Sequence, residues 1–131
     1  MSVECAAPPF QVCGACKGAW PTWEAFVVDP AVRLIGLQSV VTNVDINLLI
    51  FEHTCGSSIS ILARRVRHLL PPTDGPLPRL MGSAQCRGHC LRLDDLAACD
   101  APCSNARDRD LILLVERMKK EALAFPHRRP L

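Results

Sequence analysis

The first half of the chain contains runs in which apolar and polar residues alternate, and this pattern predicts a small sheet. Residues 32–41 and 44–53 are rich in apolar and β-branched side chains, which are common in strands. Thr42 and Asn43, between the two runs, suit a tight turn. Residues 57–61 alternate again and predict a third strand. We therefore expect an antiparallel hairpin sheet of two or three strands.

Apolar residues spaced three or four positions apart predict helical segments. Trp20, Trp23 and Phe26 have this spacing, and Pro21 suits the first turn of a short helix. We expect the three aromatic side chains to pack in the core. The same spacing recurs after Leu62, where the third strand is expected to pass into a helix.

The longest predicted helix covers about residues 106–124. Leu111 and Met118 lie on its apolar face, as is typical of a helix that packs against a core. Ser104 or Asn105 can cap its amino end. Because the strand signals and the long helix occupy separate parts of the sequence, the predicted fold class is α+β.

A stretch rich in proline and glycine divides the chain into two parts. Residues 71–85 show no apolar periodicity and are interpreted as a connector. The connector separates the hairpin region, residues 1–70, from residues 86–131, which include the C-terminal helix. The predicted organisation is thus two subdomains.

Composition excludes a disordered chain, because 49% of the 131 residues are hydrophobic. No run approaches the roughly 18 apolar residues that a membrane-spanning helix needs, so no membrane partner is expected. The amino terminus lacks the basic flank and apolar stretch of a secretory signal. We therefore expect a cytoplasmic protein, in which thiols stay reduced.

Cysteines carry most of the chemical information in this sequence. Seven of the eight cysteines, with one histidine, form four short groups: Cys13-Gly-Ala-Cys16, His53-Thr-Cys55, Cys86-Arg-Gly-His-Cys90 and Cys99-Asp-Ala-Pro-Cys103. The eight side chains divide into two sets of four, which is the ligand number of a structural zinc site. In an exported protein, disulfides would be the leading alternative. Cys5 is left over and is interpreted as an incidental thiol.

The first predicted metal site takes its ligands from a CxxC turn and from the end of the hairpin: Cys13, Cys16, His53 and Cys55. Glycines beside the CxxC pair allow backbone N–H groups to point at the thiolates. The one-residue spacer before Cys55 leaves open whether His53 is a ligand or a polar residue at a strand end. Over residues 13–70 this arrangement resembles the plan of zinc-ribbon and treble-clef proteins. The resemblance implies two ligand pairs that a hairpin brings together around zinc.

The second predicted metal site consists of two CxxxC pairs ahead of the C-terminal helix: Cys86, Cys90, Cys99 and Cys103. Four thiolates suit zinc, but they also suit an iron-sulfur cluster. His89 is either a substitute ligand or a spectator. The predicted fold is therefore an α+β hairpin sheet with a metal knuckle, followed by a cysteine-rich metal-bound segment and an amphipathic helix.

These patterns favour a non-enzymatic, zinc-stabilised binding or adaptor module with two structural sites and another protein as its partner. No phosphate-binding or nucleophile motif is present in the sequence. A redox role for Cys13 and Cys16 would need a CxxC at a helix start, whereas hairpin signals follow here. Two alternatives stay open. One is an iron-sulfur redox or sensor protein, and the other is a nucleic-acid-binding zinc protein that uses Arg64, Arg65 and Arg67.

Overall fold

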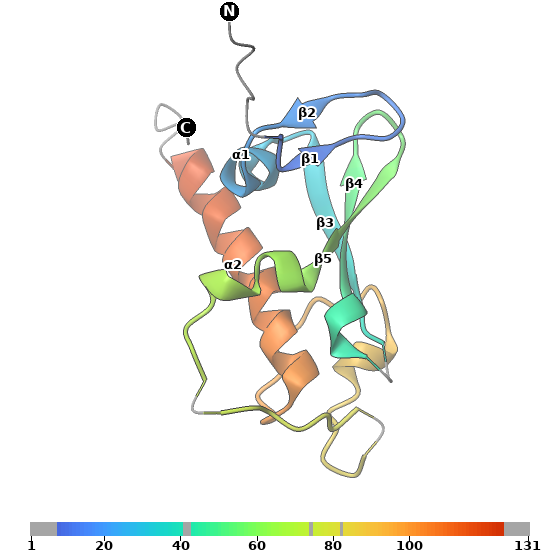
Figure 1. Ribbon diagram of the computed structural model, residues 1–131, viewed down its shortest axis with the longest axis vertical. Coiled ribbons are helices and arrows are strands. Elements are labelled where there is room, and N and C mark those ends of the chain that lie inside the picture. Colours follow the sequence, from blue (N-terminus) through green and yellow to red (C-terminus); the bar gives the residue numbers. More distant parts are fainter. Residues whose placement is uncertain (1–7, 41–42, 74, 82, 125–131) are drawn as a thin grey trace, which may run out of the picture.

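A three-stranded antiparallel sheet and a long C-terminal helix form the framework of the protein (Figure 1). The computed structural model describes residues 8–40, 43–73, 75–81 and 83–124. The strands are β3 (Val32–Gln38), β4 (Leu48–His53) and β5 (Ser58–Leu62), and β4 lies in the centre of the sheet. The α+β class and the three-stranded hairpin sheet predicted from the sequence are thus confirmed.

Alternation along the strands places one face of the sheet in the core. Phe51 on β4 is fully buried and pairs with Leu34 on β3 and Ile59 on β5. The register between β3 and β4 shifts between Leu34 and Gly36. Such an irregularity changes the alternation of side chains, and it lets Leu34 and Leu37 lie buried although they are three positions apart.

A small hairpin and a short helix cover one end of this sheet. The hairpin pairs β1 (Gln11–Val12) with β2 (Ala19–Trp20), and α1 (Trp23–Val28) follows directly. The Thr22 hydroxyl caps α1 by accepting the Ala25 N–H at 3.1 Å. The predicted helix in this segment is confirmed, and its aromatic residues belong to the main core.

The connection between β3 and β4 is longer than the tight turn predicted at Thr42 and Asn43. The strands end at Gln38 and begin again at Leu48, and a 3-10 turn, η1 (Val44–Ile46), lies between them; Thr42 is outside the described residues. The prediction of a tight turn is therefore wrong. Its physical reason is Asn47, whose buried side chain accepts the Val40 N–H at 2.8 Å and holds the two ends of a wider loop.

The helix predicted after Leu62 is also shorter than expected. The chain forms two 3-10 turns instead, η2 (Ala63–Arg65) and η3 (Arg67–Leu69). Pro71 and Pro72 follow at once and prevent a longer helix. Val66, between the two turns, is buried in the main core, so the apolar spacing did identify the inward-facing residue.

Helix α2 (Ser104–Ala124) matches the long helix predicted at residues 106–124. Its first hydrogen bond runs from the Arg107 N–H to the Cys103 carbonyl at 3.2 Å, so the N-cap position belongs to Cys103 rather than to Ser104 or Asn105. The buried face of α2 joins the same core as the sheet and α1 through Leu111 and its neighbours. Figure 1 shows α2 running past α1 and the sheet.

The segment between η3 and α2 has little regular structure. In its described part, residues 71–103 contain a single 3-10 turn, η4 (His89–Leu91). The predicted boundary at 71–85 stays a prediction, although residues on both sides of it share the main core. Among the described residues, none of the helices has the length and apolar character needed to cross a membrane.

Candidate metal centre

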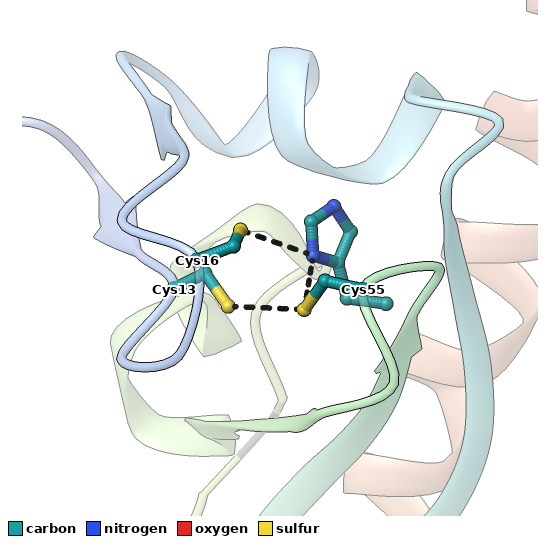
Figure 2. A group of neighbouring side chains, drawn as sticks. Cys13, Cys16 and Cys55 are labelled. Carbon is teal, nitrogen blue, oxygen red and sulfur yellow. Dashed lines mark hydrogen bonds between the residues drawn. The ribbon is translucent and has the colours of Figure 1, made fainter.

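The first predicted ligand set converges on one point at the end of the sheet. The four ligand atoms of Cys13, Cys16, His53 and Cys55 all lie within 4.8 Å of one another. Figure 2 shows that the three thiols come from two loops, the β1–β2 turn and the β4–β5 turn, that face each other. This Cys3His group could hold a metal ion.

The β1–β2 turn presents the first ligand pair. The Cys13 N–H donates to the Gly18 carbonyl at 2.7 Å, and the Lys17 N–H donates back to the Cys13 carbonyl at 2.9 Å. Lys17 has a φ of 67°, in the left-handed region, and so reverses the chain after Cys16. The Gly18 N–H then lies 3.4 Å from the Cys16 sulfur. This N–H donor is the kind of contact that orients a thiolate ligand.

The β4–β5 turn presents the second pair. His53 ends β4, and its N–H donates to the Ser57 carbonyl at 2.9 Å. Gly56, with a φ of 96°, closes the turn, and its N–H donates to the His53 carbonyl at 2.9 Å. The His53 ring packs edge-on against Trp20, with ring centroids 5.2 Å apart. Local backbone bonds and this ring contact therefore fix the direction of the imidazole.

Two distances between ligand atoms match those of a tetrahedral zinc site. With Zn–S bonds of about 2.3 Å, two thiolate sulfurs lie about 3.8 Å apart, and a sulfur lies about 3.6 Å from a ligating nitrogen. The Cys13 and Cys55 sulfurs are 3.7 Å apart, and the Cys16 sulfur is 3.7 Å from Nδ1 of His53. The 3.1 Å distance between Nδ1 of His53 and the Cys55 sulfur is shorter. A bound ion would need to widen that one edge.

Ser57 contributes to the site although no sequence pattern pointed to it. Its hydroxyl lies 3.2 Å from the Cys13 sulfur and 3.0 Å from the Cys55 sulfur. A hydroxyl in this place can donate a hydrogen bond to a thiolate, and such outer contacts orient metal ligands. Ser57 directly follows the Cys55-Gly56 turn. Its position in the sequence alone does not distinguish a serine that contacts the thiols from a solvent-exposed serine in a strand.

The surroundings favour the thiolate form of two of the cysteines. The Cys16 N–H and the Ser57 hydroxyl lower the pKa of Cys13 to about 5, more than burial raises it. The Ser57 hydroxyl is also the main cause that lowers the pKa of Cys55. Metal ions bind the deprotonated thiol. The lowered pKa values of Cys13 and Cys55 therefore favour the form that can bind a metal.

The other two ligands keep their protons more strongly. The Gly18 N–H lowers the pKa of Cys16, but burial and the neighbouring thiols of Cys13 and Cys55 together raise it above its ordinary value. The hydrogen bond with Cys55 is the main cause that raises the pKa of His53. A metal ion must therefore displace a proton from Cys16 at neutral pH, and metal affinity must depend on pH.

The second predicted set is brought together less closely. All four of its cysteines line one small cavity between the η4 region and the start of α2: Cys86, Cys90, Cys99 and Cys103. The Cys3His centre is the one group of three or more such ligands gathered within 4.8 Å in the described part of the chain. A metal site at the second set therefore stays a prediction. The cysteines that the structure describes are all free thiols.

His89 is engaged by a carboxylate rather than by the thiols. Its Nδ1 lies 2.9 Å from Oδ2 of Asp95. That hydrogen bond agrees with the reading of His89 as a spectator between Cys86 and Cys90. Cys5 lies outside the described residues.

Two of the three arginines considered for nucleic-acid binding have partners within the chain. Arg65 donates to the Phe10 carbonyl and to Oε1 of Gln11, and its guanidinium lies 4.3 Å from the centre of the Phe10 ring. Arg67 forms an ion pair with the buried Asp108. Arg64 is exposed. Two of the three cations thus serve contacts inside the fold.

Comparison with known proteins gives no relative from which a function could be transferred. No protein-family model matches the sequence, and no curated protein and no solved structure shows significant similarity to it. The function must therefore be argued from the centre itself.

Proposed function

We propose that the protein is a non-enzymatic module stabilised by a structural zinc ion bound to Cys13, Cys16, His53 and Cys55. The observation that carries this proposal is the convergence of the four ligand atoms from two turns that are far apart in the sequence. Three thiolates and one imidazole form a donor set that suits zinc, because softer ligands select zinc over magnesium or calcium. In plan, the centre resembles a zinc ribbon.

A structural role is favoured over a catalytic one because the ligand set is complete. Catalytic zinc sites keep a fourth position for water, whereas structural sites fill all four positions with protein atoms. The ion would tie the β1–β2 hairpin to the β4–β5 turn. The small hairpin has strands of two residues each, which is too short for independent stability. Binding of the ion would thus contribute directly to folding.

The proposed partner is another protein. Leu91 and Leu93 are exposed at 66% and 44%, and they provide apolar surface near the edge strand β3. A nucleic-acid role has less support, because Arg65 and Arg67 are held by contacts within the chain. The proposal therefore assigns the protein to adaptor or binding modules rather than to nucleic-acid-binding zinc proteins.

Zinc content and its effect on Trp20 test the proposal. The full chain carrying Trp23→Phe keeps Trp20, which packs against His53, as its single tryptophan. We expect zinc in the purified protein, and we expect chelation to change the Trp20 emission and to lower the melting temperature. The variant Cys16→Ser should reproduce both effects, whereas Cys5→Ser, outside the ligand set, should not. Unchanged emission and melting after complete zinc removal would refute a structural role.

A further inference from the structure

We propose that Cys86, Cys90, Cys99 and Cys103 form a second, mononuclear metal site that binds one zinc ion through four thiolates. This site uses none of the residues of the Cys3His centre, and it lies in a different part of the fold. The first observation is that all four thiols, from two separate stretches of chain, line the same small cavity.

Backbone and side-chain donors already face the sulfurs of this cavity. The Gly88 N–H lies 3.4 Å from the Cys86 sulfur, which reproduces the 3.4 Å contact between the Gly18 N–H and Cys16 in the first centre. The Leu80 N–H lies 3.2 Å from the Cys103 sulfur. N–H groups aimed at sulfur stabilise the thiolate form, as in known metal-thiolate sites.

A buried arginine adds positive charge beside the cavity. Arg109 is fully buried, and its Nη1 lies 3.9 Å from the Cys90 sulfur. Bonds to the Ala97 carbonyl at 2.7 Å and to the Asp95 carboxylate at 3.2 Å hold the guanidinium in place. A four-thiolate zinc site carries net negative charge. The guanidinium shares its charge with Asp95, and Nη1 remains directed towards the Cys90 sulfur as a donor.

The chemistry of four thiolates fits a single zinc ion. Zinc takes four ligands in a tetrahedral structural site, and the two local cysteine pairs supply that number. An iron-sulfur cluster can use the same four thiolates, so metal and sulfide content distinguish the two.

The surrounding segment has only a small buried cluster of its own. Its buried cluster consists of Ala101, Cys103 and Ala106, all small side chains. The described part of residues 71–103 contains one 3-10 turn and no strand. Small or loosely packed segments commonly depend on a metal or on cross-links for stability. An ion shared by two CxxxC pairs would fasten this segment to the amino end of α2.

Metal counting on the full chain tests the second site separately from the first. In protein purified without oxygen, we expect about two zinc ions per chain, one for each set of four ligands. Cys90→Ser with Cys99→Ser should lower the content to one, and so should Cys16→Ser, which disables only the first centre. Cys5→Ser is the matched control and should leave the count unchanged. One ion in the wild type, lost in Cys16→Ser, would overturn the second site and leave the first intact.

Alkylation of the wild-type protein gives a second readout that does not depend on folding of a variant. With zinc bound, peptides containing Cys86, Cys90, Cys99 and Cys103 should resist iodoacetamide, and they should react after chelation. Rapid labelling of these thiols before chelation would overturn the site. Iron with sulfide and visible absorption would replace it with a cluster, and a mass that indicates disulfides would replace it with covalent cross-links.

Discussion

Arg67 holds the carboxylate of Asp108 with two guanidinium nitrogens, Nε at 2.6 Å from Oδ1 and Nη2 at 2.8 Å from Oδ2. Asp108 lies on α2 and is fully buried, while Arg67 lies on η3. Asn47 adds a third contact, because its Nδ2 donates to Oδ2 of Asp108 at 2.9 Å. One buried carboxylate thus joins the loop before β4, the turns after β5 and the C-terminal helix.

Replacement of Asp108 is expected to destabilise the protein strongly. In Asp108→Ala, Arg67 and Asn47 each lose the buried acceptor that they share, although Arg67 keeps Asp45 and Asn47 keeps Asn105. Removing one partner of a buried charged pair costs about 3 kcal/mol or more, and we expect that loss in urea unfolding. Asp45→Ala is the matched control, because Asp45 pairs with the same arginine at 3.4 Å but is 61% exposed. That control should cost less than about 1 kcal/mol.

Gly36 is expected to tolerate no side chain. A Cβ at this position would meet the side chain of Leu93 and would lie 2.7 Å from the Leu93 carbonyl oxygen. That same oxygen accepts the Leu37 N–H at 3.0 Å, which fastens the segment around residue 93 to the edge of β3. Gly36→Ala should therefore lower stability by about 1–3 kcal/mol.

The double variant Gly36→Ala, Leu93→Ala separates the two sources of this clash. Shortening Leu93 removes the side-chain overlap but leaves the carbonyl in place, so recovery of stability should be partial. Thermal unfolding of the wild type, both single variants and the double variant measures this coupling. Equal stability of Gly36→Ala and the wild type would contradict the close approach of the two segments.

Arg64 and Arg65 are neighbours in sequence with different expected roles. Arg65 contacts Phe10 and Gln11, whereas Arg64 is exposed. Arg65→Ala should lower the melting temperature, by the equivalent of about 1 kcal/mol, and Arg64→Ala should leave it unchanged. If the protein bound nucleic acid through this group, both variants would instead weaken salt-sensitive binding of an oligonucleotide. Fluorescence polarisation with labelled single- and double-stranded probes distinguishes these outcomes.

The sequence predicted the strands from alternation, and it predicted from the positions of two short motifs that Cys13, Cys16, His53 and Cys55 would lie together. Alternation identifies β3, β4 and β5, and the hairpin between the two motifs predicts that the CxxC turn faces His53-Thr-Cys55. The participation of His53, left open by its one-residue spacer, gains support from the position of its Nδ1 near two sulfurs.

Features that depend on contacts between residues far apart in the sequence could not be predicted from local patterns. The loop before β4 is wide because Asn47 bonds to Asn105 at 2.7 Å and to Asp108, about sixty positions further along the chain. Cys103 occupies the N-cap position of α2, although cysteine is not among the residue types preferred there. Ser57 reaches the Cys3His group only because the β4–β5 turn brings its hydroxyl to two sulfurs.

The Ser57 hydroxyl is expected to set the pH at which the Cys3His centre releases its metal. The hydroxyl is the main cause of the lowered pKa of Cys55. It is the second cause, after the Cys16 N–H, of the lowered pKa of Cys13. A thiol with a lowered pKa competes less strongly for protons, so protons displace its metal only at a lower pH. Ser57→Ala should raise both pKa values, so its zinc should be released at a higher pH than zinc in the wild type. A zinc-sensitive dye during acid titration reports the midpoint.

Ser58→Ala is the matched control for this titration, because Ser58 is the next residue along the chain and is exposed on β5. Its midpoint should equal that of the wild type. The backbone bond from the His53 N–H to the Ser57 carbonyl survives in Ser57→Ala, so the turn itself should persist and the shift can be assigned to the hydroxyl. Identical midpoints for Ser57→Ala and Ser58→Ala would mean that the hydroxyl does not stabilise the thiolates, and that the backbone N–H groups of the turns are sufficient to prepare the centre for metal.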